Sequence, residues 1–399
     1  MMAEDPWLTI IGLGEDGPEG LPPSSLAALN GAEIVMAPAR HLALLGGTQQ
    51  QTIPWPVPFA DGIAQLLSLR GRRVVVLVSG DPFWFGAGSV LARELDRTEW
   101  TALPGVSCFA LAAAKLGWPI ETTPCLGLHA APLSRLRPHL GNGARVIVTL
   151  RDGKAVTELA AYLAEIGFEG STLHVMEALG GPRECISTLP VRDIGDRAFE
   201  HPVCVAAQVT GTGQSMPKTS GLADDWFDHD GQITKSPVRA LTLSALAPRR
   251  DEHLWDIGGG SGSVAIEWLL ADPTTRATSV EAEPERAKRI EMNAARLGVD
   301  RLKVVAGQAP DVLHDLPAPD AVFVGGGLSD DMLAFLQGLP SGTRLVSNAV
   351  TLETEALLTA AHAKHGGTLL RIELAHSAPL GAKRGWRASY PIVQWSVTL

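Results

Sequence analysis

A turn rich in glycine marks one stretch of the second half of the chain as a place where backbone could approach a ligand closely. In 254–268, LWDIGGGSGSVAIEW, glycines stand at positions 258, 259, 260 and 262, between a predicted strand and a predicted helix. Such a turn lets main-chain N–H groups meet a ligand at the start of the helix. A tight strand-to-helix turn that binds nothing has the same composition, so the turn alone leaves both interpretations open.

A carboxylate at the end of the next strand favours the ligand-binding interpretation. Glu281 closes the predicted strand in ATSVEAEPER, about 20 residues after the turn, where doubly wound nucleotide-binding folds carry an acid that accepts hydrogen bonds from a ribose diol. The compressed GGGSGS run lacks the G-x-G-x-x-G spacing that usually cradles a pyrophosphate. Together they predict an adenosine ligand without a pyrophosphate, S-adenosylmethionine (SAM) rather than NAD.

Three loops of the first half also carry Gly or Pro just after a predicted strand. They are IIGLGEDGPEG, VSGDPFWFGAG and LPGVSCFALAAAKLGWP, and all three should open on one edge of a sheet. Each loop alone is equally typical of an ordinary turn. Their joint order favours a second ligand site.

The elements that would position these loops are those of an α/β protein, because short β-branched runs alternate with stretches of helical spacing in both halves. The first-half strands are WLTIIGLG, AEIVMAP, RVVVLVSG, EWTALPG, RVIVTL, STLHVMEAL and PVCVAAQV, with helices over 24–30, 89–95 and 156–166. We expect parallel pairing through crossovers, and two lobes that part near Pro124. The second-half strands are LWDIGGG, ATSVEAE, LKVVAG, PDAVFVGGG, TRLVSNAV, TLLRIELA and PIVQWSVTL, and they predict an open doubly wound sheet that binds ligands at the carboxyl ends of its strands.

The periodicity fails in GTGQSMPKTSGLADDWFDHDG, which mixes Gly, Ser, Thr, Pro and Asp like a connector. We therefore expect one domain over 1–211, a linker over 212–231 and a second domain over 232–399. A chain of 399 residues is long enough for two cores.

Charge and composition exclude several classes of partner. Lys and Arg number 33 against 43 Asp and Glu, a formal net charge of -10, which disfavours nucleic acid. No apolar run approaches the length of a membrane span, and the start, MMAEDPW, lacks the features of an export signal. The four cysteines, Cys108, Cys125, Cys185 and Cys204, have no metal-binding spacing, so we expect reduced thiols, no metal and a cytoplasmic protein.

The second half resembles the decarboxylating methyltransferase domain of cobalamin biosynthesis over 231–399. The resemblance rests on ITKSPVRAL, WDIGGGSGSVAIEW, the helix of Asn293, GQAPDVLHDLPAPDAVFVGGG and TLETE. It implies SAM contacts at Thr234, Gly258, Gly259, Gly260, Ser261, Gly262, Glu281 and Ala309. A helix N-cap is the alternative role for Thr234.

The three loops of the first half, in their order, resemble the tetrapyrrole methylase family over about 7–211. That family folds into two α/β lobes with SAM in the cleft between them. The resemblance implies SAM neighbours at Gly12, Gly14, Asp81, Trp84, Ser107 and Cys108. The family often has a small hydroxyl residue where Cys108 stands here.

The two domain types occur fused among the decarboxylating methyltransferases of cobalamin biosynthesis, and this chain resembles such a fusion from end to end. The resemblance implies two SAM sites per chain, methylation of precorrin-6B at carbon 5 by the first half and at carbon 15 by the second, and loss of carbon dioxide from the ring C acetate to give precorrin-8X. We expect a homo-oligomer with a tetrapyrrole as its partner and neither nucleic acid nor membrane. The alternatives are a methyltransferase acting on RNA or another macromolecule, and a non-catalytic carrier of SAM or a corrinoid. No residue is assigned as the proton donor.

A basic cluster near the end of the chain is the candidate site for the substrate carboxylates. Lys383, Arg384 and Arg387 lie in PLGAKRGWRASYP, which we expect to be a loop joining the last two strands on the same edge as the glycine turn. Arg binds carboxylates with two parallel hydrogen bonds, and Trp386 could lie against the macrocycle. A solvated hairpin loop is the alternative.

Overall fold

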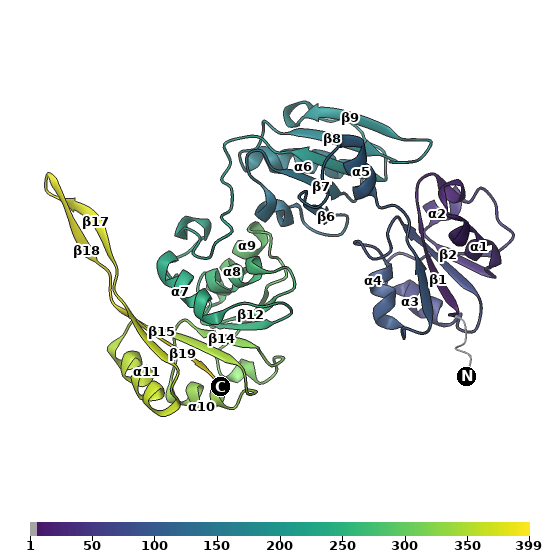
Figure 1. Ribbon diagram of the computed structural model, residues 1–399. Helices are drawn as coiled ribbons and strands as arrows, with labels where there is room; N and C mark the ends of the chain where they lie inside the picture. The colour runs from purple at the N-terminus through teal and green to yellow at the C-terminus, as the bar shows by residue number, and fades with distance from the viewer. Residues whose placement is uncertain (1–5) are drawn as a thin grey trace. The chain divides into compact units, whose positions relative to one another are not determined.

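A computed structural model describes residues 6–399, which fold into two compact units (Figure 1). The first unit comprises the chain as far as Leu133 together with His139–Ser215, and the second comprises Ser134–Pro138 and Met216–Leu399. No helix among the described residues is long and apolar enough to cross a membrane. Most of the opening MMAEDPW, from which we argued against an export signal, lies outside the described residues.

The first sheet of the first unit is wholly parallel, as predicted. Its strands are β1 (Leu8–Leu13), β2 (Ile34–Ala37), β3 (Gln51–Pro54), β4 (Val74–Ser79) and β5 (Trp100–Leu103), in the order β3-β2-β4-β1-β5. Helices α1 (Pro23–Gly31), α2 (Ala39–Leu44), α3 (Asp61–Leu67) and α4 (Gly88–Glu94) lie between them in the chain. The central strands β1, β2 and β4 are almost entirely buried, which explains their continuous apolar runs. Strand β3 was missed because QTIP is short and mostly exposed.

The second sheet of the first unit is mixed, so the expected parallel pairing is wrong here. Its strands are β6 (Cys125–Gly127), β7 (Arg145–Thr149), β8 (Thr172–Glu177), β9 (Cys185–Pro190) and β10 (Val203–Gln208), in the order β6-β7-β10-β8-β9. Only β6 and β7 pair in parallel; β10 pairs antiparallel with β7 and with β8, and β8 pairs antiparallel with β9. The apolar runs indicate that these strands are buried, but burial does not set the direction of pairing.

Helix α5 (Cys108–Leu116) packs against this second sheet. Helix α6 (Lys154–Glu165) lies between β7 and β8 in the chain. Phe109 and Ala112 of α5 share a hydrophobic core with Ile147 and Cys204. The two lobes therefore part between β5 and α5, upstream of the position at which we expected the division.

The second unit contains the seven predicted strands in one doubly wound sheet. They are β11 (His253–Ile257), β12 (Arg276–Glu281), β13 (Lys303–Ala306), β14 (Ala321–Val324), β15 (Arg344–Ala349), β16 (Thr368–Ile372) and β19 (Ile392–Thr398), in the order β13-β12-β11-β14-β15-β19-β16. The helices are α7 (Ser236–Leu246), α8 (Ser263–Ala271), α9 (Pro284–Arg296), α10 (Asp330–Gln337) and α11 (Leu352–His365). Only β19 runs antiparallel, between β15 and β16. The strand order reverses at β11, so the turn after β11 lies where doubly wound sheets bind ligands.

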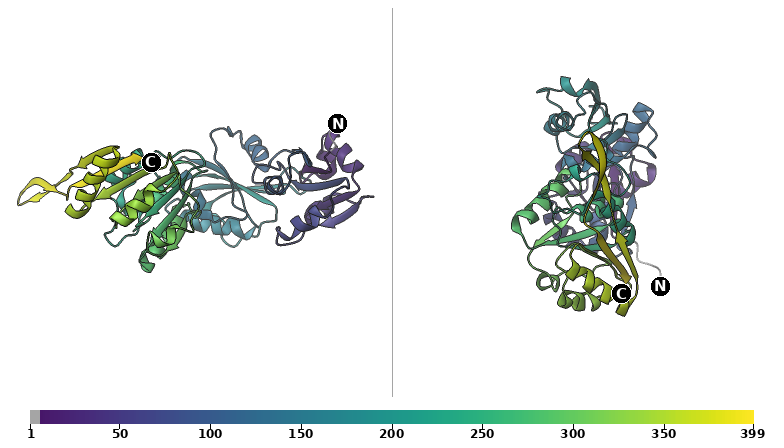
Figure 2. Two further views of the ribbon diagram at one scale, coloured as in Figure 1. Left: turned by 90° about the horizontal axis from the view of Figure 1, so that it is seen from below. Right: turned by 90° about the vertical axis from the view of Figure 1, so that its left-hand side faces the viewer.

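A two-stranded hairpin projects from the second unit between β16 and β19 (Figures 1 and 2). It consists of β17 (Ala375–Leu380) and β18 (Lys383–Ala388), paired with each other in a sheet of their own. Its side chains are mostly exposed, including 80% of Trp386. Because β17 and β18 bury almost nothing, their sequences lack the apolar alternation from which strands are predicted.

The hairpin corrects our expectation of a loop at the basic cluster, because Lys383, Arg384 and Arg387 are residues of strand β18. Side chains alternate between the two faces of a strand. Lys383 and Arg387 therefore share one face, and Arg384 shares the other with Trp386. Arg384 and Arg387 therefore lie on opposite faces of β18, and only Arg384 lies on the face of Trp386.

Part of the expected linker packs into the second unit. Leu222, Trp226 and Phe227 are buried in the core that also contains Leu243 and Trp268. The apolar residues of this segment are too widely spaced to show a period, so the sequence did not indicate that they are buried.

The guanidinium of Arg239, in α7, holds this segment in place. Arg239 is fully buried; its Nε donates to Glu267 Oε1 of α8 at 2.5 Å, and other N–H groups donate to the carbonyl oxygens of Leu222 and Thr234. Glu267 in turn accepts the backbone N–H of Leu222 at 3.0 Å. Charge-assisted hydrogen bonds thus connect the segment before α7 to helices α7 and α8.

The short stretch Ser134–Pro138 also contacts residues of the second unit, of which it forms part. Arg135 makes a bidentate ion pair with Asp300, at 2.7 and 3.0 Å. The Arg137 guanidinium lies 4.6 Å from the centre of the Trp226 ring, a cation–π distance.

We predict that a fragment of residues 216–399 is more stable than one of residues 232–399. The shorter fragment loses the burial of Leu222, Trp226 and Phe227, each contributing roughly 1.5–3 kcal/mol, so the free energy of unfolding should fall by several kcal/mol. Urea denaturation followed by far-ultraviolet circular dichroism measures the difference. Both fragments lack Ser134–Pro138, so that stretch does not affect the comparison. Equal stability would show that 216–231 is a passive linker.

Candidate functional sites

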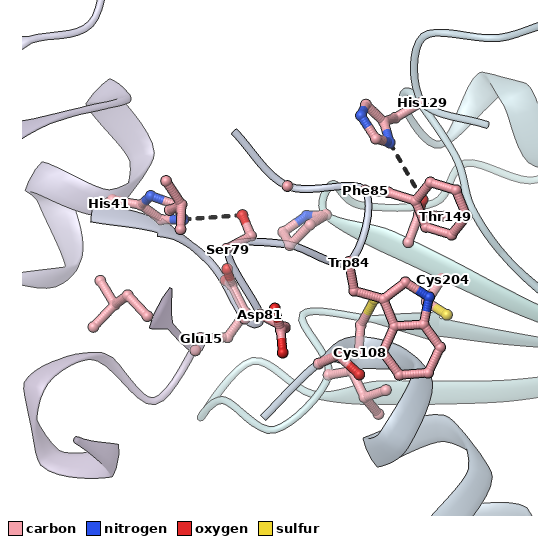
Figure 3. A pocket seen from close by; sticks show the side chains of 18 of the residues that line it. Glu15, His41, Ser79, Asp81, Trp84, Phe85, Cys108, His129, Thr149 and Cys204 are labelled. Carbon is pink, nitrogen blue, oxygen red and sulfur yellow. Dashed lines mark hydrogen bonds between the residues drawn. The ribbon is translucent and has the colours of Figure 1, made fainter. Parts of the chain in front are cut away.

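A cavity of about 390 Å³ opens in the first unit, at the carboxyl ends of β1 and β4 and beside the start of α5 (Figure 3). Both sheets contribute to its wall, which includes Leu77 and Val78 of the first sheet and Thr149 and Cys204 of the second. The wall is predominantly apolar with a few polar groups, the usual composition of a site for an organic ligand.

Five of the six residues that the sequence singled out in this half line the cavity: Gly14, Asp81, Trp84, Ser107 and Cys108. The sixth, Gly12, does not line it. A Cβ on Gly12 would overlap the carbonyl oxygen of Gly80 and the nitrogen of Gly105. The absence of a side chain at Gly12 therefore lets the loops after β1, β4 and β5 pack against one another.

Two of these side chains shape the loops that they belong to. Asp81 Oδ1 accepts the backbone N–H of Phe83 at 2.8 Å, which fixes the turn after β4. Ser107 is the N-cap of α5, and its Oγ accepts the backbone N–H of Ala110 at 3.1 Å.

Cys108 is paired with a second thiol across the cavity wall. Its side chain hydrogen-bonds with that of Cys204, which lowers the pKa of the Cys108 thiol and raises that of the buried Cys204 thiol. Figure 3 shows both sulfur-bearing side chains beside Trp84. The thiol at position 108 thus has a specific partner in β10.

A polar cluster that the sequence analysis missed lies on another part of the wall. Glu15 is ion-paired with Arg40 and, at 3.2 Å, with Arg183. An Nη2 of Arg40 donates to Ser79 Oγ at 2.9 Å and to His41 Nε2 at 2.8 Å. Burial, with the neighbouring Arg40 charge, lowers the pKa of His41 to about 4, so this imidazole is neutral at physiological pH.

A signal for this cluster was present in the sequence. Glu15 follows Gly14 directly, and Arg40 and His41 come shortly after strand β2. Because carboxyl ends of parallel strands share one edge of a sheet, polar residues after β1 and β2 should have been expected to meet.

In the second unit, the structure brings the glycine turn and Glu281 together. The backbone N–H of Gly260, a residue with φ of 59°, donates to Glu281 Oε2 at 2.8 Å. Glu281 Oε1 accepts the N–H of Glu283 at 3.0 Å. A carboxylate has about four acceptor positions, so the buried Glu281 can fix the turn and still accept from a ligand.

Ser261 and Asn293 connect the turn to the segment before α7. Asn293 Nδ2 donates to the carbonyl oxygens of Ser261, at 3.0 Å, and Asp228, at 2.9 Å. Ser261 is 1% exposed, and its Oγ has no hydrogen-bond partner within the described chain. Buried hydroxyl groups are nearly always hydrogen-bonded, so this orphaned oxygen supports a polar ligand at the turn.

The two remaining predicted contacts, Thr234 and Ala309, lie in the segment before α7 and in the loop after β13. Thr234 precedes α7, whose N-cap is Lys235, so the alternative role of Thr234 as the N-cap is wrong. Ala309 lies in the loop after β13, in which the N–H of Gly307 donates to the carbonyl oxygen of Glu281 at 2.9 Å.

Asp256, which the sequence analysis did not select, lies directly under the turn in β11. Burial raises the pKa of its carboxyl to about 7, against a hydrogen bond from Ser279 Oγ at 3.2 Å that lowers it. The signal was its place immediately before IGGG at the end of a buried strand. A carboxyl that titrates near neutral pH at such an edge is typical of a functional site.

Two family models match the chain, one in each half. The model described as "Tetrapyrrole (Corrin/Porphyrin) Methylases" matches residues 7–195, and that described as "Precorrin methyltransferase domain" matches residues 225–399. The two matches fall on the two halves that contain the cavity and the glycine turn.

Curated relatives match the chain nearly from end to end. The precorrin-6Y C(5,15)-methyltransferase [decarboxylating] of a Sinorhizobium species is 46% identical over 98% of this chain and 96% of its own length. The protein of the same name from Mycobacterium tuberculosis is 39% identical, over 98% of this chain and 99% of its own. The cobalt-precorrin-6B C(15)-methyltransferase (decarboxylating) of Salmonella typhimurium is 32% identical over 40% of this chain and 85% of its own.

We predict that Glu281→Ala weakens SAM binding at the second unit on the order of 10- to 150-fold, because a charge-assisted hydrogen bond to a ribose hydroxyl contributes about 1.5–3 kcal/mol. Titration calorimetry on the full chain should show one SAM site weakened and the other unchanged. Glu283→Ala is the matched control, because it removes the same charge from an exposed neighbour. Unchanged binding in Glu281→Ala would remove Glu281 from the site.

Proposed function

The chain belongs to the family of decarboxylating precorrin-6Y C(5,15)-methyltransferases, and we propose that it methylates precorrin-6B at carbons 5 and 15, releases the ring C acetate carboxyl as carbon dioxide and forms precorrin-8X. It is a methyltransferase that uses SAM. The observation that carries the proposal is that each unit has its own candidate site, and each lies in a half that matches a different methyltransferase model.

We propose two SAM sites per chain, one in each unit. At the first, Gly14, Asp81, Trp84, Ser107 and Cys108 would surround the cofactor in the cavity, with Gly12 holding the loops together. At the second it would be held by the turn from Gly258 through Gly259, Gly260, Ser261 and Gly262, with Thr234, Glu281 and Ala309 beside it. The apolar cavity and the orphaned Ser261 Oγ both fit such a ligand.

Bound SAM supplies a methyl group already activated on a sulfonium. The protein's own task is then alignment, and holding two reactants in place can supply roughly 7–11 kcal/mol. At the second site the fixed positions of Gly260 and Glu281, joined by a 2.8 Å hydrogen bond, serve this purpose. The Salmonella relative, which is named for carbon 15 methylation with decarboxylation and aligns with 40% of the chain, supports assigning both steps to one half, which we take to be the second.

The function is tested by incubating the full chain with precorrin-6B and SAM and following the product by mass spectrometry. We predict a product heavier by two methyl groups and lighter by one carbon dioxide. Variants disabled at Glu281 should still add one methyl group, at carbon 5, without loss of carbon dioxide. Methyl transfer to RNA, or SAM binding without turnover, would contradict the proposal.

We further propose that the hairpin cations Lys383, Arg384 and Arg387 bind substrate carboxylates. The hairpin of β17 and β18 leaves the sheet after β16, at the edge where the carboxyl ends of the parallel strands lie. We also propose that the protein is cytoplasmic and that it forms a homo-oligomer. The exposed Leu380 and Trp386 of the hairpin support the oligomer, since large exposed apolar side chains often mark protein interfaces.

The two faces of β18 make the carboxylate hypothesis specific. Arg384→Ala should raise the tetrapyrrole KM for carbon 15 methylation about tenfold, because Arg384 shares a face with Trp386. Lys364→Ala, which removes one exposed positive charge from α11 rather than from the hairpin, is the control and should leave the KM unchanged. SAM affinity should stay constant in both variants. A normal KM in the Arg384→Ala, Arg387→Ala double variant would exclude the hairpin from substrate binding.

A further inference from the structure

Phe85, in the loop after β4, combines a strained backbone with an exposed ring at the cavity. Its φ is 55°, in the left-handed region that bulky residues rarely adopt. Its side chain is large and apolar yet 51% exposed, and it lines the cavity. Backbone strain of this kind persists where the surrounding structure enforces it, and it often occurs at ligand sites.

The surroundings of Phe85 fix the direction of its ring. The ring packs against Gly127 in β6, where a Cβ would lie 2.7 Å from Phe85 Cγ. It also meets the ring of Phe109 edge-on, with 5.9 Å between centroids. Figure 3 shows Phe85 beside Thr149 in the wall of the cavity. The exposed ring is therefore held by packing in one orientation.

The size of the cavity separates two kinds of ligand. At about 390 Å³ it is near the lower end of the roughly 300–1,000 Å³ typical of small-molecule pockets, which suits one cofactor. A tetrapyrrole macrocycle with its carboxylate side chains must then lie at the opening. Val106, which also lines the cavity, is 61% exposed there.

We propose that Phe85 and Val106 form the surface on which the conjugated part of the substrate ring lies at the first methyl-donor site. The inference rests on the proposed function, and it assigns a positioning role to Phe85 that is separate from cofactor binding. Aromatic rings favour offset stacking on other flat π systems. Arg40 lines the cavity and shares the carboxylate of Glu15 with Arg183, so this wall presents a partly exposed cation to a substrate with many carboxylates.

The experiment compares Phe85→Ala with Phe83→Ala in the full chain. Phe83 belongs to the same loop and is 43% exposed, but it packs against Trp100, at 5.5 Å between centroids, and does not line the cavity. Carbon 5 methylation of precorrin-6B is followed by nuclear magnetic resonance with ¹³C-methyl SAM. Phe85→Ala should raise the tetrapyrrole KM about tenfold and leave the calorimetric SAM Kd unchanged, and Phe83→Ala should change neither. Phe85→Tyr should restore the KM.

A second variant displaces the ring without removing it. In Gly127→Ala the new Cβ would collide with Phe85, so the tetrapyrrole KM should rise while the SAM Kd stays constant. An equal KM increase in Phe83→Ala, or a SAM Kd that changes as much as the KM, would overturn the inference. If the wild type is active and Phe85→Ala has a normal KM, only the role of Phe85 is overturned. If the wild type never methylates precorrin-6B, the proposed function is overturned as well.

Discussion

The architecture of the second unit depends on one buried charge. A guanidinium that is fully removed from water must have its hydrogen bonds and counter-charge in place, because a buried ion left without its partner costs about 3–5 kcal/mol. Arg239 finds them in the carboxylate of Glu267 and in the carbonyl oxygens of Leu222 and Thr234. These partners belong to the segment before α7 and to α8, the helix that follows the glycine turn. The pairing requirement of Arg239 therefore ties the path of that segment to the helix on which the second candidate site is built.

The two candidate sites reach the same kind of geometry by different means. In the first unit, close packing of backbone at Gly12, Gly80 and Gly105 aligns three loops beside a cavity. In the second, hydrogen bonds from Glu281 and Asn293 hold a single turn at the edge of one sheet. The first arrangement is sensitive to any added side chain, and the second to the loss of a polar one.

The parts of the fold that the sequence predicted are those whose burial leaves a periodic pattern. All seven strands of the second unit's sheet were recognised, as were four of the five strands of the parallel first sheet, because the central strands of both sheets are buried along nearly their whole length. The predicted parallel pairing of β10 was wrong, because its apolar sequence pattern indicates that the strand is buried but not which neighbour it pairs with or in which direction. The hairpin was missed for the opposite reason, since β17 and β18 bury too little to leave a pattern.

At the sites, the sequence located the loops but not the groups that support them. Gly14, Asp81 and Trp84 were assigned by the resemblance of their loops to the tetrapyrrole methylases, and all three line the cavity. Arg40 and His41 were missed because they come from another strand end, and their meeting with Ser79 depends on strand order. Phe85 was not singled out, because neither its left-handed backbone conformation nor the exposure of its ring can be predicted from the residue type.

The stretch Ser134–Pro138 has a consequence for how the protein is made. Its partners, Trp226 and Asp300, lie far downstream in the chain, so this stretch leaves the ribosome before the surface that receives it exists. The elements on both sides of it can fold meanwhile, since domains generally form as units during synthesis. Arg135 cannot form its ion pair with Asp300 until about three quarters of the chain has been synthesised, so this stretch reaches its final place late in translation.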